Sequence, residues 1–252
     1  MTARPLNFDL ERARRAVVPL TTIGATGASQ LRLGGGSATL IDVRADRDGE
    51  PVGLWLTAAH VLEASSNWGL VDFFDSDGRA PRHEIAWTLA RFAPGDVAAI
   101  FARFPSPSDV ARPFRIATRR PEPGTLLYGA GWGEPELGDR FALTPGRAFS
   151  PPPANEGGGI AGLQNASVGD VDAPHWGWVA ALARPGDSGG PILDANGALV
   201  GIRSGGIAAS TNERDVRGSR FGRYFSTVGA EFVAAVRSSF ASKIAAKPYL
   251  FD

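Results

Sequence analysis

Hydrophobic residues occur along this chain in short runs, and glycine or proline usually separates one run from the next. Many runs are rich in β-branched residues, as is typical of strands. The clearest runs are 17–20, 37–43, 52–56, 71–74, 84–92, 125–133 and 198–202. The turn-forming stretches Asp46–Gly49 and Asp194–Gly197 predict hairpin tips, and the glycines at 34–36 predict another turn. The pattern favours a protein built from strands and turns.

Two segments are predicted to differ from this pattern. The charged stretch Glu11–Arg15 predicts a short helical lead-in. Near the other end, Phe232, Val233, Val236 and Phe240 follow the spacing of an amphipathic helix. We expect that helix to pack against the rest of the protein.

Composition limits the partners and cofactors to be expected. The 26 basic and 26 acidic residues give a formal net charge of zero, so we expect no nucleic acid partner and no membrane binding. Gly157, Gly159 and Gly162 formally match a dinucleotide signature, but they follow three prolines instead of a strand. Asp46 and Asp48 lack the other ligands of a calcium loop. We therefore expect no cofactor and no metal.

The start of the chain and its cysteine content suggest a compartment. The opening residues contain acidic side chains and no apolar core, unlike a secretory signal. No stretch approaches the roughly 18 apolar residues of a membrane-spanning helix. Cysteine is absent from the sequence. If Met1 is the natural start, we expect a cytoplasmic protein.

The strongest indication of chemistry is the stretch Gly186–Pro191, in which Gly186 lies two residues before Ser188 and Gly189 and Gly190 follow it directly. Glycines allow backbone conformations in which successive N–H groups converge on one point, as an oxyanion requires. A serine hydroxyl becomes a good nucleophile when a neighbouring histidine takes its proton. The chain contains three histidines, at positions 60, 83 and 175.

The order of these residues separates two kinds of hydrolase. Gly186-x-Ser188-x-Gly190 also fits the elbow of α/β-hydrolases, in which the histidine follows the serine. No histidine follows Ser188 here, so that order is excluded. The order histidine, aspartate, serine remains, with His60 upstream.

These residues resemble the chymotrypsin-like (trypsin-like) serine protease family, in a bacterial-type, cysteine-free form. Thr57–His60 is similar to the histidine motif of that family, and Gly186–Pro191 is similar to its serine motif. Leu199–Ile202 followed by Ser204 looks like the strand that lines the substrate cleft. The resemblance covers roughly residues 17 to 235.

The resemblance implies an all-β fold of two six-stranded antiparallel β-barrels with a C-terminal α-helix. It implies the following division of the chain: an N-terminal lead-in at 1–15, a first barrel at 16–110, a linker at 111–124, a second barrel at 125–227, and a C-terminal helix and tail at 228–252.

The resemblance also implies a serine endopeptidase with His60, Asp96 and Ser188 as its catalytic triad, and with the N–H groups of Gly186 and Ser188 as its oxyanion hole. Asp96 precedes an apolar strand, which would place its carboxylate beside His60. The other acids between His60 and Ser188 that we considered lie in polar or turn-like contexts: Asp72, Asp75, Asp77 and Asp109. We expect His83 to be solvated, and His175 to pack at the surface or against aromatic residues.

Substrate binding is implied for Leu182, Arg203, Ser204, Gly205 and Gly206. Leu182 aligns with the base of the primary pocket, so cleavage after Lys or Arg is not favoured. Arg203 aligns with a pocket-lining position that is basic in some relatives that prefer acidic residues. Either the pocket selects acidic P1 residues, or Arg203 faces solvent and the pocket takes apolar ones. Ser204–Gly206 would pair with the substrate as a β-strand edge.

Activation and function keep alternatives open. In the trypsin branch, a new N-terminal ammonium pairs with the aspartate before the serine, here Asp187. A cut after Arg15 would create such a terminus, but many bacterial-type members order the loop without a cut. The expected partner is a protein or peptide substrate, and a regulatory partner protein is left open. The rival functions are a catalytically impaired protease-fold module that binds a peptide, and an esterase-like acyl hydrolase.

Overall fold

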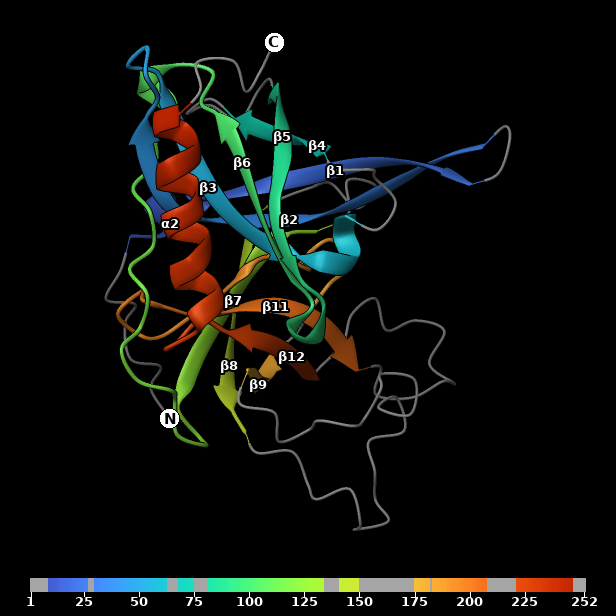
Figure 1. Ribbon diagram of the computed structural model, residues 1–252. Helices are drawn as coiled ribbons and strands as arrows, with labels where there is room; N and C mark the ends of the chain where they lie inside the picture. Colours follow the sequence, from blue (N-terminus) through green and yellow to red (C-terminus); the bar gives the residue numbers. More distant parts are fainter. Residues whose placement is uncertain are drawn as a thin grey trace.

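The computed structural model describes residues 9–26, 30–62, 68–74, 81–133, 141–149, 175–181, 183–207 and 221–246. Its strands form two closed antiparallel barrels that follow one another along the chain (Figure 1). The fold predicted from the sequence is therefore confirmed. The proposed boundaries of the domains stay a prediction.

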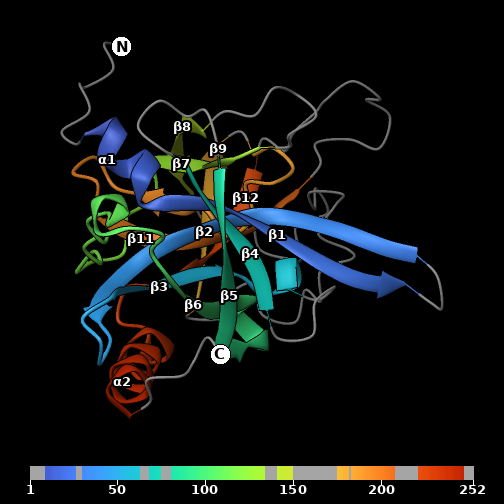
Figure 2. The same ribbon diagram turned by 90° about the horizontal axis from the view of Figure 1, so that it is seen from above.

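The first barrel contains six strands in the order β1-β2-β3-β6-β5-β4, and a pairing of β1 with β4 closes it. The strands are β1 (Val17–Thr26), β2 (Gln30–Ala45), β3 (Pro51–Ala58), β4 (Trp68–Phe74), β5 (Pro81–Phe92) and β6 (Val97–Arg103). Their apolar side chains fill the interior, where Trp55 and Phe101 are almost completely buried. The β1–β2 hairpin projects well beyond the barrel in both views (Figures 1 and 2).

The second barrel repeats this architecture in the order β10-β11-β12-β9-β8-β7, with β10 and β7 paired at the closure. Its strands are β7 (Leu126–Trp132), β8 (Phe141–Ala148), β9 (Trp176–Ala181), β10 (Pro191–Leu193), β11 (Leu199–Ile207) and β12 (Phe221–Ser226). The turn predicted at Asp194–Gly197 joins β10 to β11, and the Asp194 carboxylate accepts hydrogen bonds from the N–H groups of Asn196 and Ala198.

Two α-helices and three short 3-10 turns complete the described chain: α1 (Leu10–Arg15), η1 (Ala59–Leu62), η2 (Ala93–Gly95), η3 (Pro107–Asp109) and α2 (Glu231–Ala246). The α2 helix, predicted from its apolar spacing, lies along the first barrel (Figure 1). Its buried side chains join the core of that barrel, and the Phe240 ring lies 6.5 Å from the Phe101 ring. No helix among the described residues is both long and apolar enough to span a membrane.

The turn predicted at residues 34–36 is wrong, because these glycines lie inside β2. Gly36 is buried, and a Cβ at this position would lie 2.7 Å from Val61 Cγ2 and 2.8 Å from the carbonyl oxygen of Ser188. Gly36 therefore serves close packing inside a strand. Its missing side chain lets β2 contact both η1 and the loop that carries Ser188.

Candidate active site

Strand pairing brings His60 and Asp96 together. Ala58 is opposite Val97 in the β3–β6 ladder, so the residues just beyond this pair, His60 in η1 and Asp96 after η2, are neighbours. Asp96 adopts a left-handed backbone conformation, with φ of 44°. Its carboxylate accepts a hydrogen bond from the His60 backbone N–H at 2.9 Å and lies 2.7 Å from His60 Nδ1.

The second barrel supplies a further contact to this carboxylate. Ser204, at the bend of β11, donates its hydroxyl to Asp96 Oδ2 at 2.5 Å. Burial alone would raise the pKa of Asp96, but hydrogen bonds from His60 and Ser204 and the charge of His60 lower the pKa below its ordinary value. An ionised carboxylate only accepts hydrogen bonds, so Nδ1 of His60 carries the proton and Nε2 is left as an acceptor.

The other histidines take part in different contacts. His83 is exposed and lies 2.6 Å from Asp72, and Asp109 pairs with Arg82. These two acids help to line a cavity of about 570 Å³ beside α1, whose lining does not include His60. Asp75 and Asp77 lie outside the described residues.

His175 contacts the turn that carries Asp96. Its Nε2 lies 2.9 Å from the carbonyl oxygen of Pro94, and its ring packs edge-on against Phe92 at 5.6 Å. Because His175 precedes β9 and Pro94 belongs to η2, this contact joins the two barrels next to Asp96.

The loop around Ser188 folds so that only some of its N–H groups are hydrogen-bonded within the protein. The N–H groups of Asp187, Gly189 and Gly190 donate to backbone carbonyl groups at 2.7 to 3.1 Å. Those of Gly186 and Ser188 have no hydrogen-bond partner within the described parts of the chain. Gly186 and Gly189 have φ values of 89° and 88°, which favour glycine. Two unbonded N–H groups two residues apart are what an oxyanion hole requires.

The Ser188 loop docks directly on the first barrel. The backbone carbonyl oxygen of Ser188 accepts a hydrogen bond from the Ser37 N–H at 2.7 Å, and that of Gly189 accepts one from Thr39 Oγ1 at 2.9 Å. Val61, next to His60, and the Ser188 carbonyl oxygen both lie within 3 Å of the Cβ position of Gly36. His60 and Ser188 thus lie on adjoining segments. No hydrogen bond between the Ser188 hydroxyl and the His60 imidazole occurs among these described residues.

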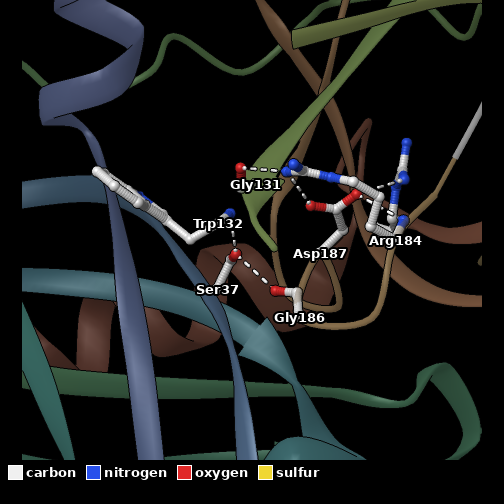
Figure 3. Close-up of polar contacts among 7 residues, drawn as sticks. Ser37, Gly131, Trp132, Arg184, Gly186 and Asp187 are labelled. Atoms are coloured by element: carbon white, nitrogen blue, oxygen red, sulfur yellow. Dashed lines mark hydrogen bonds and ion pairs between the residues drawn. The ribbon is translucent and has the colours of Figure 1, made fainter. Parts of the chain in front are cut away.

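A buried serine links this loop to β7. Ser37 Oγ accepts a hydrogen bond from the Trp132 N–H and donates one to the Gly186 carbonyl oxygen, both at 2.9 Å (Figure 3). Ser37 is fully buried, so no water replaces these bonds. The arrangement fixes the peptide group that follows Gly186. Nothing in the residue pattern around Ser37 marked it as a site residue.

Beneath the loop, the Asp187 carboxylate is 4 % exposed and contacts two arginines. Arg184 donates its backbone N–H at 2.8 Å and its Nη2 at 3.2 Å, and Arg203 donates Nη1 at 3.4 Å. Arg203 is 2 % exposed, so the alternative in which it faces solvent is wrong. Its contact with Asp187 accounts for its charge without a substrate, and gives no support to acidic P1 selectivity.

The remaining predicted substrate residues follow Arg203 along β11. Ser204 is buried with its hydroxyl on Asp96, and Gly205 and Gly206 pair with β12. In the described chain the β10–β11 ladder ends at Ile202, so the other edge of residues 204–206 has no strand partner. A substrate strand could pair there. Leu182 lies outside the described residues.

The two barrels, the His60–Asp96 pair and the glycine-flanked serine define a protein of the chymotrypsin-like serine protease class. Residues 36–202 match the trypsin-like peptidase domain. The chain therefore belongs to the trypsin-like peptidase family, as its motifs predicted.

Solved structures show the same fold. Similar structures include the HtrA-type protease AlgW with a tripeptide and a serine-to-alanine variant of AlgW with a tripeptide. Both are 20 % identical to this chain, with a TM-score of 0.59. The alignments cover 93 % and 92 % of this chain and 62 % of each of those chains. A comparison with curated protein sequences gives no significant match.

Proposed function

We propose that this protein is a serine endopeptidase that cleaves peptide bonds through His60, Asp96 and Ser188. The observation that carries the proposal is the 2.7 Å contact between His60 Nδ1 and Asp96, on a segment that adjoins the Ser188 loop. This contact holds the imidazole in the tautomer that accepts a proton at Nε2. The free N–H groups of Gly186 and Ser188 provide the matching oxyanion hole.

The reaction proceeds by acyl transfer to water. Ser188 Oγ attacks the peptide carbonyl carbon while His60 takes the hydroxyl proton. The tetrahedral oxyanion accepts hydrogen bonds from the N–H groups of Gly186 and Ser188. The imidazolium then gives its proton to the leaving amine, and an acyl-enzyme remains. Water attacks the acyl-enzyme with His60 again as base, which releases the carboxylic acid and restores Ser188.

The unpaired edge of residues 204–206 supports an extended peptide as substrate, because a strand edge offers backbone hydrogen bonds to any sequence. The AlgW structures, which contain a tripeptide, are consistent with this choice. As part of the proposal, the protease acts on a specific protein inside the cell, in line with a sequence that contains no cysteine.

A fluorophosphonate probe tests the nucleophile, because it reacts with an activated serine. We expect the probe to label the wild-type protein at Ser188 and to leave Ser188→Ala unlabelled. Ser106→Ala is the matched control, since Ser106 bonds with Ser108 at the start of η3. Equal labelling of the wild type and Ser188→Ala would refute the proposed mechanism.

One observation favours the alternative, a peptide-binding module without catalysis. No hydrogen bond joins Ser188 to His60 in the described residues, although such bonds often form only with substrate present. Casein and a small p-nitrophenyl ester separate the functions. Cleavage of casein supports the endopeptidase, hydrolysis of the ester alone supports an esterase, and peptide binding without labelling supports the module.

A further inference from the structure

The inference concerns the buried charges below the Ser188 loop, and it rests on the proposed endopeptidase function. Asp187 is buried, and an unpaired carboxylate in such a place is strongly unfavourable. It is paired in the uncut chain, with Arg184 at 3.2 Å and Arg203 at 3.4 Å. No new N-terminal ammonium is needed to neutralise it.

Three glycines of one strand face make room for this cluster. Gly129, Gly131 and Gly133 alternate along β7 and its end, so they point to the same side. A Cβ would lie 1.9 Å from Arg203 Nη2 at Gly129, 2.7 Å from Asp187 Oδ1 at Gly131, and 2.9 Å from Arg184 Cζ at Gly133. The sequence Gly-Ala-Gly-Trp-Gly thus forms a floor on which all three charged side chains lie.

The cluster also holds the backbone of the loop. The backbone carbonyl oxygen of Arg203 accepts a hydrogen bond from the Gly189 N–H at 2.7 Å, and the backbone N–H of Arg203 donates to the Gly190 carbonyl oxygen at 2.8 Å. Arg184 donates Nη2 to the Gly131 carbonyl oxygen at 3.3 Å, and its backbone N–H to Asp187 at 2.8 Å (Figure 3). Main chain and side chains of the same two arginines therefore hold the loop on both sides of Ser188.

The segment that a cut after Arg15 would release is already anchored. The Ala16 N–H donates to the carbonyl oxygens of Arg12 and Ala13 as the cap of α1, and the Ala16 carbonyl oxygen accepts the Leu40 N–H. Ala16 is fully buried. A cut would separate the Ala16 nitrogen from α1, which it caps, and would offer an ammonium to a carboxylate that already has two cationic partners.

We propose that Arg184 and Arg203 are positioning residues that hold the oxyanion loop in its working form without proteolytic activation.

This arrangement has a signature at alkaline pH. An N-terminal ammonium has an ordinary pKa near 8 and loses its charge in mildly alkaline solution. Burial lowers the pKa of Arg203 and so does the charge of Arg184, while Asp187 raises it. Because a guanidinium has the highest ordinary pKa of the basic side chains, it keeps its charge through the range in which an ammonium titrates. The loop is therefore held equally well at pH 7 and at pH 10.

The test is the rate of fluorophosphonate labelling from pH 6 to pH 10.5 in the wild type and in Arg203→Lys. Labelling of the wild type should stay level through the alkaline part of this range, because both guanidinium groups keep their charge. A buried lysine titrates below its ordinary value near 10.4. Arg203→Lys should therefore resemble the wild type near pH 7 and fall about tenfold or more as the pH rises through the lysine pKa.

Two further variants complete the design. Arg184→Lys, whose side chain is 28 % exposed, should show the same alkaline loss and covers the case in which the Arg203 variant fails to fold. Arg147→Lys, an exposed arginine of β8 that donates to the Gly124 carbonyl oxygen, is the matched control and should show none. Circular dichroism at each pH confirms that every variant is folded.

The outcomes separate this inference from the proposed function. Wild-type labelling that is level at high pH, with an alkaline loss in the lysine variants alone, supports the two arginines. An alkaline loss in the wild type, with intact mass showing a cut after Arg15, overturns the inference but leaves the endopeptidase. Level profiles in folded Arg203→Lys and Arg184→Lys also overturn it. A wild type that is never labelled refutes the proposed function itself.

Discussion

Replacing Ser37 with alanine should separate the stability of the protein from the alignment of its oxyanion hole. Ser37 Oγ bonds the Trp132 N–H and the Gly186 carbonyl oxygen in a site without solvent. Ser37→Ala leaves one buried donor and one buried acceptor without partners, at about 1–3 kcal/mol each. We therefore expect the free energy of unfolding to fall by about 2–6 kcal/mol.

The kinetic effect should be larger than instability alone explains. Without the bond from Ser37, the peptide group between Gly186 and Asp187 can rotate. The N–H groups of Gly186 and Ser188, which lie on either side of it, then lose their alignment with the oxyanion. Because losing one such donor typically lowers kcat by 10²–10³, partial misalignment should lower it by about 10- to 100-fold. KM should change little, since the oxyanion develops only in the transition state.

Urea denaturation and ester hydrolysis measure the two effects on the same preparations. Thr227→Val is the control, because Thr227 is buried and bonds the Leu199 carbonyl oxygen away from the loop. It should lose about 1–2 kcal/mol of stability and keep its kcat. If Ser37→Ala loses the expected stability but keeps kcat within twofold, Ser37 does not position Gly186 and the argument fails.

Three other substitutions test the site. Asp96→Asn should lower kcat by about 10⁴ with the fold retained, because an amide no longer fixes the tautomer of His60; a loss below tenfold would contradict this role. Gly189→Ala should cost about 3 kcal/mol or more, since its Cβ would lie 1.9 Å from the Ser37 carbonyl oxygen at a φ of 88°. Gly49→Ala, with a φ of 85° and open space around it, should cost only about 1 kcal/mol in the same thermal melts. Ser204→Ala removes a hydrogen bond that lowers the pKa of Asp96, so that pKa should rise. The lowered pKa stabilises the fold above the ordinary value of 3.8, and this stabilisation is lost as the pH falls through the lowered pKa. Carbon NMR titration of the Asp96 carboxyl group should show the rise, and an unchanged midpoint would exclude the contact.

The sequence predicts those parts of the site that have a distinctive residue pattern of their own. The glycines around Ser188 and the small number of histidines indicated the family, and the family indicated two barrels and a final helix. The apolar strand after Asp96 predicts that this residue is the acid of the triad, and strand pairing does bring Asp96 to His60.

Residues that act through distant contacts could not be placed in this way. The glycines at 34–36 read as a turn, because a local pattern does not show which segments cross a strand. The family resemblance implies that Arg203 lines the substrate pocket, but its guanidinium lies inward on Asp187. The alternating glycines at 129, 131 and 133 were the available signal for that cluster. A glycine is required at these positions because charged side chains pack against them, and those side chains come from residues more than fifty positions later in the chain.

The position of α2 has a consequence for protein synthesis. Residues 231–246 are made after all the strands of the first barrel, yet their buried side chains complete the core of that barrel. Arg237 also donates to the Ile41 carbonyl oxygen of that barrel. The hydrogen bond from the Ser204 hydroxyl to Asp96 likewise forms only after the later half of the chain has been made. A nascent chain therefore has an incomplete first barrel, and an Asp96 without its Ser204 contact, until the segments that follow the first barrel have been made.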